Sequence, residues 1–98
     1  MIGKSLNEFL ETLTYGYEME FIYFNRYFII QGDTNDNQCK IRLDEYSKDD
    51  DTILEYEPIS LVVFGKSFEE CVKKLVLIPL IDGKTIYELE KDIEVIYG

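Results

Sequence analysis

The segment of this sequence with the most side chains capable of chemistry is an acidic run from Asp44 to Glu57, which reads DEYSKDDDTILEYE. The run contains seven carboxylates and one lysine, so it has a net charge of −6, more than half of the −10 of the whole chain. Carboxylates at this density attract the lysine and arginine side chains of other proteins. Such runs are also common as solvated loops, and the sequence leaves both interpretations open.

Tyrosines within the run favour the binding interpretation. Tyr46 and Tyr56 lie among the carboxylates. Tyrosine offers a large contact area, and it is enriched at protein interfaces. We therefore predict a partner-binding surface made of Asp44, Glu45, Tyr46, Asp49, Asp50, Asp51, Glu55, Tyr56 and Glu57.

The residue types that usually carry catalysis are scarce. The chain has no histidine, which removes the commonest general base and most zinc sites. It has no glycine-rich phosphate loop and no nucleophile elbow. Two carboxylates can act together as general acid and base in an enzyme. With twenty carboxylates in the chain, some pair will lie close together by chance, so such a pair is weak evidence of catalysis. We expect a protein that is not an enzyme and that needs no cofactor.

One pattern is that of a cation site. Asp33, Asn35 and Asn37 match positions 1, 3 and 5 of a calcium-binding loop, and Asp44 matches position 12. Gln38 stands where such a loop needs glycine for its sharp turn, and the flanking segments have the pattern of strands. We expect a polar hairpin loop here, and calcium binding remains an open alternative.

Net charge indicates the kind of partner. Acids outnumber bases by 20 to 10, which disfavours direct binding to nucleic acid or to an anionic membrane surface. The same charge favours a basic protein partner, such as a nuclease or a toxin. No apolar stretch approaches the roughly 20 residues that span a bilayer, and the start of the chain lacks the pattern of a secretory signal. With two cysteines, this composition predicts a cytoplasmic protein.

The first half of the chain predicts a helix followed by strands. Apolar residues recur with helical spacing over residues 5–13, where Ser5 and Glu8 fit a capping box. Residues 17–24 and 27–31 have the pattern of two strands joined by a turn at Asn25-Arg26. Residues 32–37 form a predicted polar loop, and residues 38–43 a third strand.

The second half predicts strands and then helices. Residues 52–57 have the pattern of a short edge strand within the acidic run, and residues 59–64 that of a buried strand. Capping boxes begin a predicted helix over 68–76 and another over 86–91. Residues 93–97 alternate, as in a terminal strand or an extended segment.

This order predicts one α+β domain over residues 1–98. Its sheet is an antiparallel meander of three or four strands, with an N-terminal helix and one or two C-terminal helices packed on one face. Glu18, Glu20, Lys40 and Arg42 would lie on the outer face, which either stays in contact with water or meets a partner. A final strand with an unpaired edge also leaves a homodimer open.

Two segments carry a resemblance to other proteins. The hairpin EFIYFNRYFIIQG and the ending FEECVKKLVLIPLIDGKTIYELEKDIEVIYG resemble small uncharacterised acidic proteins of Gram-positive bacteria and of their phages and mobile elements. The resemblance covers about the first and last thirty residues and carries no catalytic residue. Genes of such proteins often lie near defence and counter-defence systems. Together with the acidic run, which lies outside the resemblance, this context suggests a counter-defence inhibitor of the anti-CRISPR or anti-restriction type, in which carboxylates replace DNA phosphates. An ordinary adaptor or regulatory domain, and an immunity protein against a basic toxin, remain alternatives.

Overall fold

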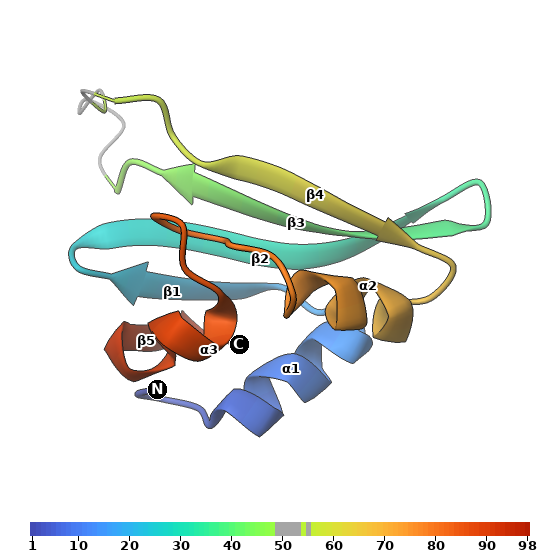
Figure 1. Cartoon of the computed structure of the whole chain (residues 1–98), viewed down its shortest axis with the longest axis horizontal. Coiled ribbons are helices and arrows are strands. Elements are labelled where there is room, and N and C mark those ends of the chain that lie inside the picture. Colours follow the sequence, from blue (N-terminus) through green and yellow to red (C-terminus); the bar gives the residue numbers. More distant parts are fainter. Residues whose placement is uncertain (49–53, 55) are drawn as a thin grey trace.

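Strands of this protein form one antiparallel sheet (Figure 1). The structure is a computed structural model and describes residues 1–48, 54 and 56–98. Within those residues the sheet has five strands in the order β4-β3-β2-β1-β5. These are β1 (Met19–Tyr23), β2 (Arg26–Asn35), β3 (Gln38–Tyr46), β4 (Ser60–Gly65) and β5 (Ile93–Tyr97). The α+β prediction is confirmed, with five strands in place of three or four.

The helices gather on one side of the sheet (Figure 1). They are α1 (Leu6–Thr14), α2 (Phe68–Leu75), α3 (Ile86–Leu89) and the short 3-10 helix η1 (Glu90–Asp92). The sequence fixes where α1 begins, because the Ser5 hydroxyl accepts from the Glu8 amide at 3.1 Å and the Glu8 carboxylate accepts from the Ser5 amide at 3.2 Å. Ser67 accepts from the Glu70 amide in the same way at the start of α2.

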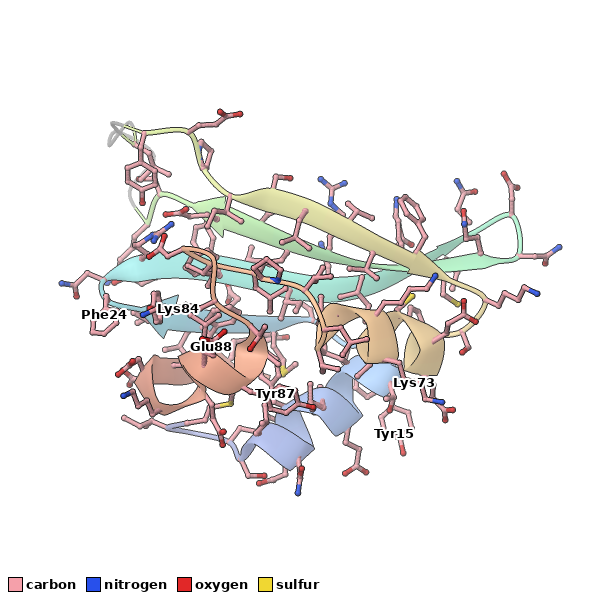
Figure 2. All side chains as sticks on the ribbon, viewed as in Figure 1. Tyr15, Phe24, Lys73, Lys84, Tyr87 and Glu88 are labelled. Atoms are coloured by element: carbon pink, nitrogen blue, oxygen red, sulfur yellow. The ribbon has the colours of Figure 1, made fainter. Side chains whose placement is uncertain are left out.

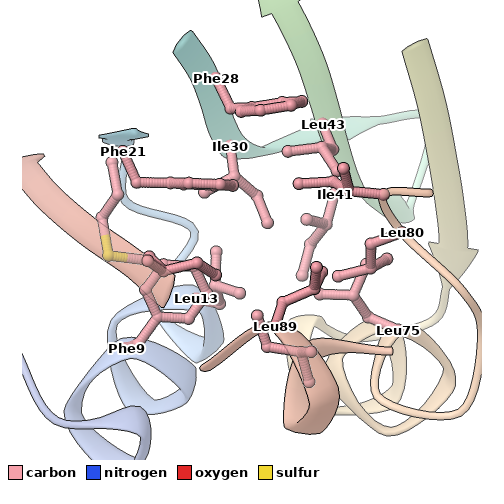
Figure 3. Close-up of a cluster of buried hydrophobic side chains, with 14 of the residues drawn as sticks. Phe9, Leu13, Phe21, Phe28, Ile30, Ile41, Leu43, Leu75, Leu80 and Leu89 are labelled. Carbon is pink, nitrogen blue, oxygen red and sulfur yellow. The ribbon is translucent and has the colours of Figure 1, made fainter. Parts of the chain in front are cut away.

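Alternate strand residues face these helices and form the core (Figure 3). Phe28, Ile30, Ile41 and Leu43 come from neighbouring strands and are fully or almost fully buried. Helical side chains close the core from the other side: Phe9, Leu13, Cys71, Leu75, Ile86 and Leu89. The other half of each strand therefore points to the opposite face of the sheet, called here the open face.

The turn between β1 and β2 lies one residue earlier than predicted. Phe24 and Asn25 form it, with φ angles of 45° and 64°, and Tyr23 pairs with Arg26 across it. Two positive φ angles are typical of the type I′ turn that fits the twist of a hairpin. Figure 2 shows Phe24 at the outer end of this hairpin. Arg26 therefore belongs to β2 and has the same inward direction as Phe28.

The predicted loop over residues 32–37 is mostly strand. β2 continues to Asn35, which pairs with Gln38, so only Asp36 and Asn37 form the turn, with φ angles of 49° and 66°. Asp and Asn tolerate this left-handed conformation better than most residues. The predicted strand over 52–57 falls largely outside the described residues, and its described members Leu54, Tyr56 and Glu57 have no strand structure.

The two edges of the sheet differ. β5 pairs with β1 on one side, and on its other side the Ile2 amide donates to Ile93 at 2.9 Å while the Val95 amide donates to Ile2 at 2.9 Å. The edge of the last strand is therefore covered by the N-terminal segment, contrary to the prediction of an unpaired edge there. The opposite edge is formed by β4, whose sheet neighbour is β3. Among the described residues, no helix is long and apolar enough to cross a membrane.

Candidate partner-binding surface

The open face has rows of side chains that run across the strands. One row contains Glu94, Ile22, Tyr27 and Tyr46, which are register partners from β5 to β3. The next row contains Glu20, Ile29, Asp44 and Ser60. Carboxylates and tyrosines thus surround two isoleucines on a face that no described helix covers. This arrangement resembles the polar rim and apolar centre of a protein interface.

Tyr46 lies at the centre of the acidic part of this face. Its hydroxyl donates to the Glu20 carboxylate at 3.1 Å, and its ring centroid is 6.0 Å from that of Tyr27. Burial and the nearby carboxylates of Glu20 and Glu18 raise the pKa of the Tyr46 hydroxyl, so this group remains a neutral donor at physiological pH. Lys48 Nζ lies 5.4 Å from the centre of the Tyr27 ring, which shows that this tyrosine already accommodates a cation.

Cations on the open face are mostly paired internally. Arg42 Nε lies 3.2 Å from an Asp44 carboxylate oxygen, and Lys40 Nζ lies 3.9 Å from Asp33. The other Asp44 oxygen accepts from the Ser60 hydroxyl at 2.7 Å.

Three carboxylates of the open face lack such a partner. Within the described part of the chain, no lysine or arginine forms an ion pair with Glu18, Glu20 or Glu94. We call these three residues, together with Tyr27 and Tyr46, the tyrosine–carboxylate patch. Its three carboxylates outnumber the one nearby lysine, Lys48 over the Tyr27 ring, so it has an excess of negative charge that an external cation can balance.

Glu45 does not belong to this surface, which corrects the prediction for that residue. It points to the helix-covered face, and its side chain is 1% exposed. Arg26 donates to both of its oxygens, from Nε at 3.1 Å and from Nη2 at 3.0 Å. The Tyr56 hydroxyl and the Ile59 amide also donate to this carboxylate. Glu45 is thus occupied by internal donors and cannot contact a partner.

The same cluster joins three distant segments. Arg26 Nη1 donates to both oxygens of Asp82, at 2.9 and 3.0 Å, while its guanidinium lies 5.6 Å from the Phe28 ring centre and 5.4 Å from that of Tyr56. Arg26 therefore connects β3, the end of the acidic run at Tyr56 and the Asp82 turn at one end of the core. Its pKa is raised, chiefly by the hydrogen bonds to Glu45.

Opposing effects act on the ionisation of Glu45. Burial by itself would raise the pKa of this carboxyl, but the hydrogen bonds from Arg26, Tyr56 and the Ile59 amide outweigh burial and lower it below the usual range. The Tyr56 hydroxyl has a raised pKa, chiefly because it donates to Glu45. Both shifts favour an ionised Glu45 that accepts a hydrogen bond from a neutral Tyr56.

The nine predicted residues are therefore divided. Asp44 and Tyr46 lie on the open face, and Glu57 is exposed before β4. Tyr56 is exposed at its ring but bonds inward to Glu45. The remaining four lie outside the described residues: Asp49, Asp50, Asp51 and Glu55. The described members of the run do not form one continuous acidic surface.

Sequence reasoning missed the part that Arg26 plays. It assigned this residue to a turn, although Arg26 has the same parity as the buried Phe28 and Ile30. A turn one residue earlier would have placed it inward. The pairing of Glu94 with Ile22 was also missed, because it joins segments far apart in the sequence.

The residues of the suggested calcium loop are separated. Asp33 and Asn35 lie on β2 and Asn37 in the turn, whereas Asp44 lies six residues along β3 from Gln38, about 20 Å at the usual strand rise. Among the described residues, no group of three or more potential metal ligands comes together. The calcium alternative is therefore not supported by this geometry.

A shallow hollow lies beside the Arg26 cluster. It has a volume of about 180 Å³. Its lining includes Arg26, Tyr27, Glu45, Tyr46 and Tyr56, together with Ser47 and Lys48. The Glu45 carboxylate and the Arg26 guanidinium in its lining are already bonded to one another, so a ligand that binds either of them would have to displace an internal ion pair.

Comparisons with known proteins give no family for this chain. No protein-family model matches it, and no curated protein and no solved structure matches it either. The function is therefore inferred from the geometry and charge of the surface described above.

Proposed function

We propose that this protein is a non-enzymatic domain that binds a basic protein through the tyrosine–carboxylate patch. The observation that carries this proposal is that, among the described residues, no lysine or arginine forms an ion pair with Glu18, Glu20 or Glu94, on a sheet face that no described helix covers. The other carboxylates of that face, Asp33 and Asp44, already have cation partners. The patch is therefore complementary to an external surface rich in lysine or arginine.

The tyrosines of the patch define how such a surface would be held. An arginine guanidinium can stack on the ring of Tyr46, or on that of Tyr27 in place of Lys48, while it forms a bidentate bond with Glu20 or Glu18. The isoleucines between them, Ile22 and Ile29, are half-buried and supply apolar contact. An interface needs both components, because exposed ion pairs alone contribute little affinity.

The sharper form of the proposal is an inhibitor of a basic nuclease, of the anti-CRISPR or anti-restriction type. Its carboxylates would occupy a groove that otherwise binds DNA phosphates. The support is the net charge of −10, the direct connection of the patch to the acidic run after Tyr46, and the resemblance to small proteins of phages and mobile elements. An immunity protein against a basic toxin would use the same surface, and an adaptor domain would need neither a nuclease nor a toxin.

The test is binding of a purified partner by three variants of equal charge. One variant changes the patch: Glu18→Gln, Glu20→Gln and Glu94→Gln. The second changes the run: Asp49→Asn, Asp50→Asn and Asp51→Asn. The control changes exposed acids elsewhere: Glu11→Gln, Asp36→Asn and Glu69→Gln. Each has a net charge of −7, from −10 plus 3.

The partner for this test is captured from cell extract at low salt and then purified. We expect the patch variant to raise the Kd at least about tenfold, equivalent to about 1.4 kcal/mol, and to flatten the dependence of binding on salt. The run variant should do the same if Asp49, Asp50 and Asp51 take part. The control should bind nearly as well as the wild type. Equal effects of all three variants would mean that only net charge matters, and would refute the patch.

The identity of the captured protein separates the versions of the proposal. Competition between this protein and duplex DNA for a captured nuclease would support the DNA-mimic version. A captured toxin would support the immunity version. Absence of any captured protein at low salt would contradict both inhibitor versions.

A further inference from the structure

Within residues 1–48, 54 and 56–98, no segment pairs with the outer edge of β4, and this free edge has the features of a strand that pairs with another strand. β4 lies at the end of the sheet, whereas the opposite end is covered by the bonds of Ile2 to β5. Its residues Ser60–Phe64 contain no charged residue and no proline, the usual devices that protect an exposed edge. Val62 and Phe64 are 36% and 49% exposed on the open face beside this edge.

The hydrogen-bond pattern identifies which backbone groups face the free edge. The Glu45 amide donates to Ile59 at 2.8 Å, so the antiparallel alternation directs the polar groups of residues 61, 63 and 65 toward β3. Those of Ser60, Val62 and Phe64 point the other way. Lys74 Nζ donates to the Phe64 carbonyl at 2.7 Å, as expected if this carbonyl points away from β3.

Charges at the two ends of β4 have opposite signs. Glu57 precedes the strand and is exposed, while Lys66 follows it and Lys74 lies against its last residues. In the part of the chain that the structure describes, neither Glu57 nor Lys66 has an ion-pair partner. If β4 strands from two copies pair antiparallel, the acidic end of each strand lies beside the basic end of the other. Two attractive contacts then form, one at each end of the paired strands.

We propose that two copies of this chain pair antiparallel through β4 and form one continuous ten-stranded sheet. Val62 lies on the two-fold axis opposite the partner's Val62, and Ser60 lies opposite the partner's Phe64. All three outward-facing residues of the edge then form hydrogen-bonded pairs in this register. Lys66 falls opposite the partner's Pro58, directly beside the partner's Glu57.

Lys74 must move for this pairing to form. Its Nζ leaves the Phe64 carbonyl, which then accepts from the amide of the partner's Ser60. Lys74 keeps an ionic partner, because its Nζ is also 3.4 Å from Glu70. In the monomer, Lys74 therefore occupies the outward-facing Phe64 carbonyl, and it must be displaced before a partner strand can pair there. Pairing through a single strand gives a small interface, so the dimer is weak and concentration-dependent.

The experiment is sedimentation equilibrium over about 10 µM to 1 mM, the range expected for a small interface. We expect the average mass of the wild type to rise toward twice the monomer mass. Val62→Glu places two carboxylates opposite each other on the axis and should abolish the rise, while Arg42 beside it accommodates the charge in the monomer. Val62→Thr is the uncharged control and should leave the dimer intact, and circular dichroism checks that both variants are folded.

Charge reversal tests the antiparallel register directly. Glu57→Lys alone and Lys66→Glu alone each place like charges together, and each should weaken self-association roughly fivefold. An equimolar mixture of the two variants restores opposite charges at both ends and should associate as well as the wild type. A wild type that stays monomeric throughout, a dimer that is indifferent to Val62→Glu, or a mixture no stronger than its components would each overturn the proposal.

Discussion

Asp44 and Glu45 are neighbours in the sequence, yet their carboxylates have opposite surroundings. Asp44 lies on the open face with Arg42 and the Ser60 hydroxyl. Glu45 is buried against Arg26, Tyr56 and the Ile59 amide. The period-two alternation of β3 separates them, so an acidic pair that looks uniform in sequence supplies one surface charge and one internal charge.

Replacement of Glu45 should be costly in a pH-dependent way. Glu45→Gln leaves Arg26 without its buried partner, and we expect a loss of about 2–3 kcal/mol in the free energy of unfolding at pH 7. Because the folded pKa of Glu45 is lowered, its ionisation stabilises the fold above the unfolded pKa of about 4.3, and this contribution is lost as the pH falls through the folded pKa. Urea unfolding at pH 7 and at stepwise lower pH measures both effects.

Asp44→Asn is the matched control for that measurement. It changes the adjacent carboxylate, whose side chain is partly exposed, so its cost should stay below about 1 kcal/mol. Equal costs for Asp44→Asn and Glu45→Gln, or a Glu45→Gln deficit that does not shrink in acid, would contradict the assignment of Glu45 as an internal ion-pair partner.

Turns are the elements in which sequence and structure differ most here. The strand pattern over 17–24 and 27–31 predicted the hairpin correctly, but Asn25 was assigned to the first position of the turn because asparagine tolerates positive φ. The structure places Phe24 there instead, because Tyr23 then pairs with Arg26 and both buried faces stay aligned. The buried side chains of the two strands set the register of their pairing. The turn is then formed by the residues that lie between the paired positions.

Phe24 is therefore a strained residue. It has a φ of 45°, a conformation that bulky side chains avoid, although its ring is 65% exposed and contacts Tyr23 at 4.7 Å between centroids. We expect Phe24→Asn to raise the free energy of unfolding by about 0.5–1 kcal/mol, because the relief of strain exceeds the loss of one exposed ring contact. Thermal and urea unfolding measure the change.

Asn25→Ala provides the opposite comparison at the next position. Asn25 has a φ of 64°, which asparagine tolerates and alanine does not, so this variant should be less stable than the wild type. If Phe24→Asn proved destabilising by a similar amount, the aromatic contact with Tyr23 would outweigh the backbone strain.

For the molecule as a whole, the net charge of −10 opposes folding through self-repulsion. We expect Tm to rise by a few degrees as salt increases from about 10 to 150 mM, since the screening length falls from about 30 to 8 Å. The Glu11→Gln, Asp36→Asn, Glu69→Gln variant has a smaller net charge and should show a smaller rise. A Tm that falls with salt would mean that ion pairs such as Arg26–Glu45 outweigh the general repulsion.

The fold could be predicted from the sequence much further than the site. Helical spacing, capping residues and strand alternation are local signals, and they identified α1, α2, α3 and most strands. The tyrosine–carboxylate patch depends on which strands are neighbours and which way each points, so Glu94 meets Ile22 only through the β1–β5 pairing. That pairing is long-range, so local sequence patterns do not reveal it. The acidic run was predicted as the binding surface because its charges are contiguous in the sequence.

The strand order also has a consequence for how the chain folds. In the described sheet, three of the four pairings join strands that follow one another in the sequence, whereas the pairing of Tyr23 with Ile93 closes a loop of about seventy residues. Closing a long loop is entropically slower than closing a two-residue turn, so β5 should dock after the β1–β4 meander has formed. Because the Ile2 segment is bound to β5, the two ends of the chain should dock and detach together, as the last unit to fold and the first to open.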